Sequence, residues 1–177
     1  MHKKIIRSYN TIIYSQKMNY LKLCFVYMMF VEGVICGKTT PCEDNWVVFQ
    51  GSCYLVGHDN LHFIEAERFC EHHNAYLVHV DDAVENTFLK SYLGDLKDGK
   101  HWIGLTDGVT EGIWKWSDTD TVATYSNWSP GEPNGGKSAN CAVIRSDFHY
   151  NWTDDPCSSL YKAVCEKRPV TDTEIVG

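Results

Sequence analysis

Two short stretches of the chain carry acidic and amide side chains in a pattern that suits a bound cation. Residues 128–134 read Trp-Ser-Pro-Gly-Glu-Pro-Asn, and residues 152–155 read Trp-Thr-Asp-Asp. Glu132 and Asn134 flank Pro133, so both side chains can point the same way if the loop is rigid, and an X-Pro bond can be cis at low cost. Hard cations such as calcium take carboxylate, amide and carbonyl oxygens as ligands. The two stretches therefore predict a cation-assisted binding site rather than a catalytic one.

The length and composition of the chain fit one globular domain. The 177 residues suffice for one hydrophobic core, and a hydrophobic fraction of 44% with 13% aromatic residues excludes a disordered chain. The formal net charge is -7, and the acidity is concentrated in residues 38–177, which hold 11 Lys and Arg against 22 Asp and Glu. This balance argues against nucleic-acid binding, which needs a basic surface, and it suits cations.

The first 37 residues have the pattern of an N-terminal extension followed by a secretory signal peptide. A basic start, an apolar stretch over residues 21–31 and a small-residue exit near Cys36 and Gly37 are typical of such a leader. The apolar stretch is too short for a membrane span of about 20 residues, although a membrane anchor stays the alternative. Met18 is a second possible initiator. We therefore expect a leader at 1–37, a secreted extracellular domain at 38–169 and a flexible tail at 170–177.

Six cysteines follow the leader: Cys42, Cys53, Cys70, Cys141, Cys157 and Cys165. An even number in a secreted chain predicts three disulfides, for which the sequence alone allows 15 pairings. None of these cysteines lies in a Cys-x-x-Cys pair, which argues against redox catalysis and against a zinc ribbon.

Hydrophobic periodicity predicts two helices among short strands. Residues 42–57 alternate as a hairpin. One helix is expected after a cap at Asp59 or Asn60, and a second after a capping box of Asp82 and Glu85. The polar stretch 117–140 is longer than an ordinary connection, which is typical of a functional loop. Further strand-like segments lie at 75–80, 101–107, 112–116, 141–145, 151–152 and 163–167.

From residue 42 to residue 167 the chain resembles a C-type lectin domain of the long form. The resemblance rests on the six cysteines, on Trp-Ile-Gly-Leu at 102–105, on the 128–134 loop and on the 152–157 segment. It implies an α+β fold in which two helices flank two small antiparallel sheets and a long loop carries the site. It also implies three disulfides, pairing Cys42 with Cys53, Cys70 with Cys165 and Cys141 with Cys157.

The resemblance further implies a sugar site in which one calcium ion binds the protein and two vicinal hydroxyls together. Carboxylates accept hydrogen bonds from those hydroxyls and amides donate to them. Glu-Pro-Asn looks like the version associated with mannose-type sugars, and Glu132, Asn134 and Asp154 match the calcium ligands. Thr153 stands beside them where the family has an asparagine, among the carbohydrate-binding positions. Asp107 and Glu111 match two positions of a second, structural calcium site.

Several positions depart from the family pattern. Ala139 stands where the family usually has Glu, and the loop is one residue shorter, so three negative charges at the sugar site are reduced to two. Gly135 and Asn140 stand where acidic residues of the second site would be expected. These departures and the acidity favour an alternative, a calcium-independent module of the same fold that binds protein or mineral.

Asn127 and Asn151 begin Asn-Trp-Ser and Asn-Trp-Thr, which are N-glycosylation acceptor patterns beside the expected site. A glycosidase that uses Glu132 and Asp154 is the remaining alternative, and no activated nucleophile supports it. The histidines around residues 58–79 indicate a solvated helix face rather than zinc, and the tryptophans indicate core packing rather than a sugar platform.

The sequence as a whole predicts a secreted, non-enzymatic, calcium-dependent lectin for mannose-, glucose- or fucose-like sugars, such as those of microbial surfaces. It predicts no nucleic-acid partner and no membrane span. Because one such domain binds sugar weakly, oligomerisation would serve avidity.

Overall fold

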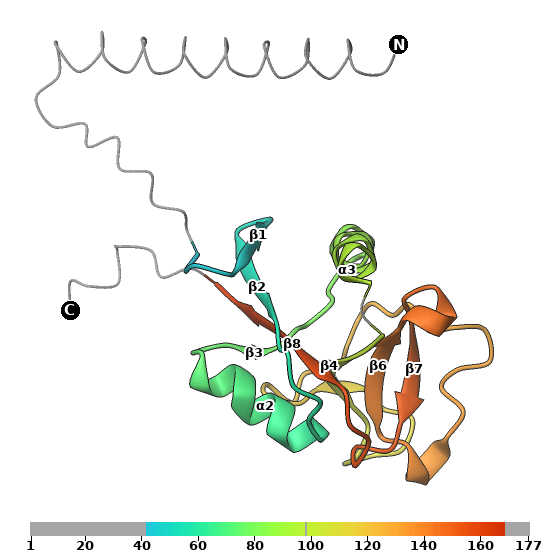
Figure 1. Ribbon diagram of the computed structural model, residues 1–177. Coiled ribbons are helices and arrows are strands. Elements are labelled where there is room, and N and C mark those ends of the chain that lie inside the picture. Colours follow the sequence, from blue (N-terminus) through green and yellow to red (C-terminus); the bar gives the residue numbers. More distant parts are fainter. Residues whose placement is uncertain (1–41, 98, 169–177) are drawn as a thin grey trace, which may run out of the picture. The chain divides into compact units, whose positions relative to one another are not determined.

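The computed structural model describes residues 42–97 and 99–168 (Figure 1). The leader expected at 1–37 and the tail expected at 170–177 lie outside the described residues. The helices are α2 (Phe63–His72) and α3 (Ala83–Leu96), with 3-10 turns η1 (Gly136–Ser138) and η2 (Ser146–Phe148). The strands are β1 (Val47–Phe49), β2 (Ser52–Val56), β3 (Tyr76–Leu77), β4 (Lys100–Thr106), β5 (Lys115–Trp116), β6 (Cys141–Arg145), β7 (Asn151–Asp155) and β8 (Lys162–Lys167).

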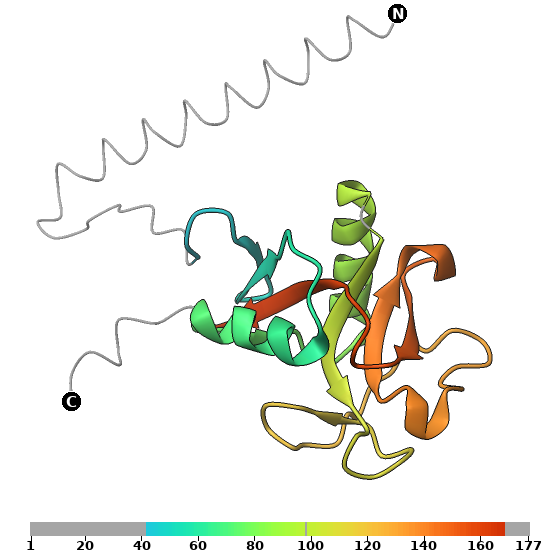
Figure 2. The ribbon, with the colours of Figure 1, turned by 60° about the horizontal axis from the view of Figure 1, so that its bottom comes forward.

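The strands form two antiparallel groups that share β8. Their order is β1-β2-β8-β4-β6-β7, with β3 added on β8 and β5 on β4. Every pairing is antiparallel except that of β4 with β8, where His101 and Trp102 lie opposite Lys162 and Ala163 in parallel. The fold expected from the resemblance is therefore present, and the short parallel pairing joins its two sheets along the central strand (Figure 1 and Figure 2).

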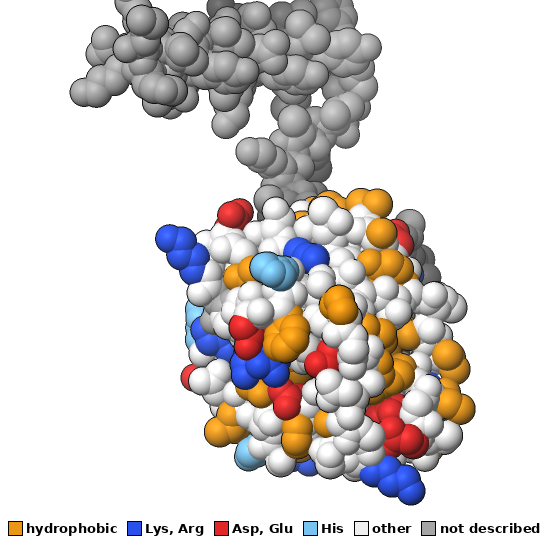
Figure 3. Space-filling view, turned by 90° about the vertical axis from the view of Figure 1, so that its right-hand side faces the viewer, with side chains coloured by type: hydrophobic (Ala, Val, Ile, Leu, Met, Phe, Trp, Pro, Cys, Tyr) orange, Lys and Arg blue, Asp and Glu red, His pale blue; other side chains and the backbone are white. Residues whose placement is uncertain are grey.

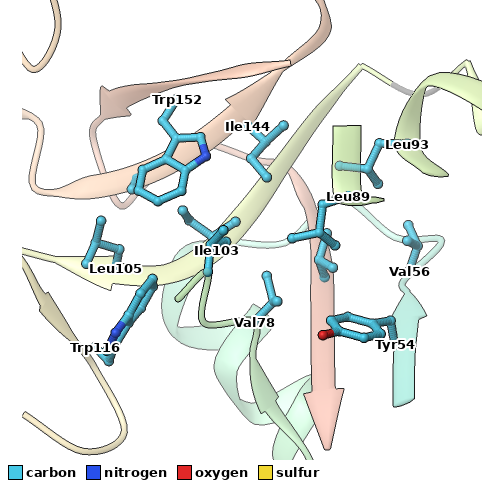
Figure 4. Packing of buried hydrophobic residues seen from close by; sticks show 13 residues of the cluster. Tyr54, Val56, Val78, Leu89, Leu93, Ile103, Leu105, Trp116, Ile144 and Trp152 are labelled. Atoms are coloured by element: carbon cyan, nitrogen blue, oxygen red, sulfur yellow. The ribbon is translucent and has the colours of Figure 1, made fainter. Parts of the chain in front are cut away.

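The two helices cover separate hydrophobic clusters. Leu89 and Leu93 of α3 pack with Ile103 and Trp152, as Figure 4 shows. Trp102 belongs to the other cluster, which we call the α2-side cluster, where it packs with buried residues of α2. Successive side chains of a strand point to opposite faces, so β4 supplies one cluster with Trp102 and the other with Ile103. This alternation keeps β4 buried on both faces.

The first helix starts later than predicted. We expected a cap at Asp59 or Asn60, and this expectation is wrong, because Leu61 forms an isolated bridge with Tyr161 and keeps the backbone extended. The amide N–H of Leu61 donates to the carbonyl of Tyr161 over 2.9 Å. The helix therefore begins only at Phe63.

The second helix is capped by Asp82, as predicted. The Asp82 carboxylate accepts hydrogen bonds from the amides of Val84 and Glu85, each over 2.8 Å. The side chain of Glu85 does not accept a hydrogen bond from the backbone amide of Asp82, so the second half of the predicted capping box is not formed. The Glu85 carboxylate accepts from the amide of Asp81 over 2.9 Å and from the hydroxyl of Tyr54 over 2.7 Å.

Within the described residues three disulfides pair the cysteines as the resemblance implied: Cys42 with Cys53, Cys70 with Cys165, and Cys141 with Cys157. The last of these ties the start of β6 to the segment after β7, beside the long loop. Among the described residues, no helix is both long and apolar enough to span a membrane.

Candidate functional site

The end of the long loop runs along the outer edge of β7. The amide of Trp152 donates to the carbonyl of Asn127 over 3.0 Å, and the amide of Ser129 donates to the carbonyl of Trp152 over 2.8 Å. Trp128 and Trp152 form a parallel bridge at the same place. The amide of Glu132 then donates to the carbonyl of Ser129 over 3.0 Å, which closes a turn. The loop therefore places Glu132 near the C-terminal end of β7, where Asp154 lies.

Asp154 holds the next two residues of the loop with its side chain. One carboxylate oxygen accepts from the amide of Asn134 over 2.9 Å, and the other accepts from the amide of Gly135 over 2.7 Å. The Glu132–Pro133 bond between these points is cis. The structure thus brings together Glu132, Asn134 and Asp154, the three residues predicted as ligands.

Gly135 is required by the close approach of the loop to β7. A Cβ atom at this position would lie 2.9 Å from a carboxylate oxygen of Asp154 and would collide with the methyl group of Ala139. Ala139 is itself buried. Gly135 and Ala139, two of the three family positions that lack acidic residues in this chain, therefore pack against each other, and neither has open space at its Cβ.

The electrostatics of this site favour a cation. Partial burial, and then the hydrogen bond and charge of the neighbouring Asp154, raise the pKa of Glu132, which Arg145 opposes. Two adjacent carboxylates disfavour ionisation of both, and a divalent cation between them would remove that cost. Each oxygen of Asp154 has a further lone pair beyond its backbone hydrogen bond. The residues present therefore fit a hard divalent cation.

The set is small for a metal site. In residues 42–97 and 99–168 no three His, Cys, Asp or Glu side chains gather into a metal-binding group. The site supplies two carboxylates, from Glu132 and Asp154, and Asn134 meets it through its backbone amide. This agrees with the reduction in charge that the sequence indicated at Ala139.

Asp155, the next residue of β7, is engaged elsewhere. Its carboxylate accepts from the hydroxyl of Tyr161 over 2.7 Å and lies 3.5 Å from the guanidinium of Arg145. Arg145 also pairs with Asp147 over 2.7 Å. Of the two consecutive aspartates, only Asp154 therefore binds the loop.

The structure does not bring Thr153 to the pair of carboxylates. Strand alternation places its side chain on the face of β7 opposite to Asp154, and its register partner is Val143 of the α2-side cluster. Thr153 is only 1% exposed, and within the described residues its hydroxyl has no hydrogen-bond partner. Its predicted contact with sugar stays a prediction that this placement does not support.

Asp107 and Glu111 precede the long loop in sequence and lie beside its last residues. One carboxylate oxygen of Asp107 accepts from the amide of Gly112 over 2.8 Å, while the other is buried and lacks a hydrogen-bond partner in the described part. The amide of Asp107 donates to the carbonyl of Asn140 over 3.2 Å. A Cβ at Gly136 would lie 4.0 Å from an oxygen of Glu111. Both carboxylates therefore border the loop, and the lone oxygen of Asp107 is an acceptor that a cation would satisfy.

The two predicted glycosylation acceptors touch each other. The side-chain amide of Asn127 donates to the side-chain oxygen of Asn151 over 2.9 Å, and the ammonium of Lys90 on α3 donates to the same oxygen over 2.7 Å. Sequence reasoning missed Lys90, because nothing in the pattern of a helix indicates a contact with a strand 61 residues later. Trp128 packs between Trp114 and Trp152, with ring centroids 4.7 and 5.8 Å away, so it serves the core as predicted.

Figure 3 looks onto the side of the molecule where β6 and β7 lie in Figure 1. Small patches of acidic and of basic side chains are scattered among uncharged groups on this face, and hydrophobic side chains gather toward its right edge. The face lacks the continuous basic surface that nucleic-acid binding requires.

Comparison with known proteins identifies the family. The family model "Lectin C-type domain" matches residues 59–167. The human protein C-type lectin domain family 10 member A is 39% identical over 134 residues, which are 72% of this chain and 40% of that protein. A perlucin-like protein of Mytilus galloprovincialis is 27% identical over 139 residues, covering 76% of this chain and 88% of that protein. The chain thus spans about two fifths of the length of the human relative.

Solved structures agree with this match. The C-type carbohydrate-recognition domain of cow CD23, crystallised in the presence of a GlcNAc2Man3 oligosaccharide, superposes with a TM-score of 0.66 at 33% identity, covering 73% of this chain and 98% of that one. A calcium-independent type II antifreeze protein gives a TM-score of 0.66 at 25% identity, covering 73% and 95%. The sequence match, the three disulfides and the fold together place this chain in the C-type lectin family.

Proposed function

We propose that the chain is an extracellular, calcium-dependent lectin that binds mannose-type sugars through Glu132, Asn134 and Asp154, without catalysis. The observation that carries this proposal is the juxtaposition of the Glu132 and Asp154 carboxylates at the end of β7. When bound, calcium would supply open coordination positions for two sugar hydroxyls.

The side chains of the site would orient the sugar. The carboxylates of Glu132 and Asp154 accept hydrogen bonds from hydroxyl groups, whereas the amide of Asn134 can also donate one. The backbone bonds from Asn134 and Gly135 to Asp154 keep these groups in place. Such an ordered set favours sugars whose adjacent hydroxyls match its spacing, as the equatorial 3- and 4-hydroxyls of mannose do.

Chromatography on mannose resin tests this proposal. The protein should be retained in calcium and released by chelator, and Glu132→Gln should abolish retention because it removes one of two carboxylates. Glu71→Gln, on the exposed face of α2, is the matched control and should behave as the wild type. Flow-through of the wild type in both buffers would refute the proposal.

The double change Glu132→Gln with Asn134→Asp tests the sugar preference separately. It exchanges the amide and the carboxylate while keeping the charge, so preference should move from mannose toward galactose. An unchanged preference for mannose would remove these two residues from the recognition of hydroxyl geometry.

A calcium-independent module that binds protein or mineral is the second candidate. It is favoured by the small number of carboxylates at the site and by the likeness to the calcium-independent antifreeze protein. In that case the wild type would pass through mannose resin in both buffers, and chelator would leave its stability unchanged.

The disulfides of the domain bear on where it works. Three disulfides favour an oxidising compartment, which supports secretion.

Asp107 and Glu111 would hold a second, structural calcium ion. The support for this second site is the carboxylate oxygen of Asp107 that is buried without a hydrogen-bond partner in the described residues.

Clustering of several chains would raise the avidity of a weak single site for glycan-coated surfaces.

A further inference from the structure

We propose that Lys90, Asn127 and Asn151 form an anchor that positions the binding loop on β7. The anchor is defined by two hydrogen bonds that converge on the side-chain oxygen of Asn151, one from the ammonium of Lys90 over 2.7 Å and one from the amide of Asn127 over 2.9 Å. It joins a helix, a strand and the loop at one atom. None of the three residues belongs to the predicted ligand set.

The anchor lies at the N-terminal end of β7, where a continuous line of contacts between the loop and this strand begins. Asn127 meets Asn151 through side chains, the backbone of Asn127 and Ser129 meets Trp152, and the amides of Asn134 and Gly135 meet Asp154. Residues 127–135 thus follow β7 from its first residue to its fourth. Because the segment is connected, fixing its first residue limits where Glu132 and Asn134 can lie.

The two ends of this line differ in their dependence on charge. At the C-terminal end of β7 the carboxylate of Asp154 accepts hydrogen bonds from the amides of Asn134 and Gly135, at the proposed cation site. At the N-terminal end of β7, the cationic Lys90 and the neutral amide of Asn127 donate to the neutral side-chain oxygen of Asn151. All three side chains are partly buried. The anchor would therefore hold the loop whether or not a cation is bound, which reduces the ordering that binding must impose.

Lys90 is a positioning residue, because its ammonium donates to Asn151 and not to a proposed ligand. Its effect must pass through Asn151 and Asn127 to the loop. A purely structural role would instead weaken the whole domain, so the test needs a local readout. Amide hydrogen exchange supplies one, because it reports the opening of individual hydrogen bonds.

The experiment compares Lys90→Met with the wild type, both made without glycosylation so that the asparagine amides are unmodified. Methionine keeps the length and apolar stem of the side chain and removes the donor. Lys115→Met is the matched control, because the ammonium of Lys115 pairs with the exposed Asp120. Exchange is measured in chelator at Ser129, Asn134 and Gly135, and at amides of the α2-side cluster as a reference for global opening.

We expect Lys90→Met to accelerate exchange about fivefold or more at the three loop amides and to leave the reference amides unchanged. Asn127→Ala should do the same, and adding it to Lys90→Met should bring little further change because both act on one oxygen. Unchanged exchange at the loop in both variants would overturn the proposal. Equal acceleration at loop and reference amides would also overturn it, since that is the signature of lost global stability.

The consequence for binding rests on the proposed lectin function and is measured separately. In calcium, Lys90→Met should elute from mannose resin several-fold earlier than the wild type, and Lys115→Met should not. If the wild type fails to bind mannose while Lys90→Met still accelerates exchange at the loop, the proposed function fails and the anchor stands. If the wild type binds and Lys90→Met leaves both retention and exchange unchanged, the anchor fails alone.

Discussion

Asp154 combines two tasks that usually fall to different residues. Its carboxylate accepts hydrogen bonds from the amides of Asn134 and Gly135, which holds the loop, and it also lies beside the carboxylate of Glu132, where we propose that a cation binds. An asparagine at this position would lose charge and one acceptor at the same time. A change at Asp154 therefore cannot separate binding from loop structure, whereas Glu132→Gln can, because it leaves the hydrogen bonds from Asn134 and Gly135 to Asp154 in place.

Gly135 gives a sharper test of the loop geometry. Gly135→Ala would place a methyl group against Ala139 and within 2.9 Å of Asp154, so the loop must move away from β7. We expect a loss of about 1–3 kcal/mol in the free energy of unfolding, which is typical of overpacking. Urea denaturation in chelator measures it.

Gly99→Ala is the control for this change. A Cβ atom at Gly99 would meet nothing within 4 Å, so the same substitution should alter the free energy of unfolding by less than about 0.5 kcal/mol. Equal stability of Gly135→Ala and the wild type would show that the loop does not approach β7 as closely as described.

The residues that we propose as ligands could be singled out from the sequence because they lie in short linear patterns. Glu132 and Asn134 flank one proline, and Asp154 follows a tryptophan, so local spacing carries the information. Lys90 and the buried oxygen of Asp107 could not be predicted in this way. Their roles depend on contacts between segments far apart in the chain, which no local pattern records.

At the scale of elements, β8 carries a buried acidic residue between two neighbouring strands. Glu166 is 6% exposed and lies opposite Tyr54 of β2 and Tyr76 of β3. The carboxylate of Glu85, on α3, accepts a hydrogen bond from the hydroxyl of Tyr54 over 2.7 Å. Burial, and to a smaller extent the charge of Glu85, raises the pKa of Glu166 to about 7. Burial likewise raises the pKa of Glu85.

This pKa predicts how stability depends on pH. The unfolded chain releases the proton of Glu166 near its ordinary pKa of 4.5, whereas the folded chain keeps it until about pH 7, so the folded state binds more protons between these values. The free energy of unfolding should therefore fall as pH rises through this window, by up to about 3 kcal/mol, and level off above it. Glu166→Gln should remove most of this slope.

Urea denaturation from pH 5 to pH 8 measures the slope, in chelator so that no cation binds the carboxylates. The difference between wild type and Glu166→Gln isolates this group from the others that titrate. Glu71→Gln on α2 controls for the loss of a surface charge. A slope in Glu166→Gln equal to that of the wild type would contradict the account of the buried carboxylate.

The elements themselves were predictable to different degrees. The hairpin of β1 and β2 and the cap of α3 at Asp82 follow from local signals, and both are confirmed. The start of α2 was not, because the bridge between Leu61 and Tyr161 overrides the local capping preference of Asp59 and Asn60. Strand alternation also placed Thr153 away from the carboxylates, although its position in the pattern suggested otherwise.

At the scale of the whole molecule, the beginning and end of the domain are held together. Cys53 of β2 lies opposite Lys167 of β8, and the ammonium of Lys167 donates to Glu43 over 2.9 Å. The disulfide of Cys70 and Cys165 closes 95 residues and joins α2 to the same strand. Closing so long a segment removes much of the entropy of the unfolded chain. The pairing of the cysteines was predictable through the resemblance, but the parallel contact of β4 with β8 was not, because its partners are far apart in sequence.

This scaffold carries the long loop, where we propose that a divalent cation is shared by Glu132, Asn134 and Asp154. A calcium titration of the full domain, followed by the NMR signals of the amides of Asn134, Gly135 and Asp154, tests that claim most directly. We predict saturable shifts with a Kd of about 10⁻⁴ to 10⁻³ M, the range of extracellular calcium modules, and their loss in Glu132→Gln. Amide signals that stay in place at calcium concentrations well above this range would contradict it.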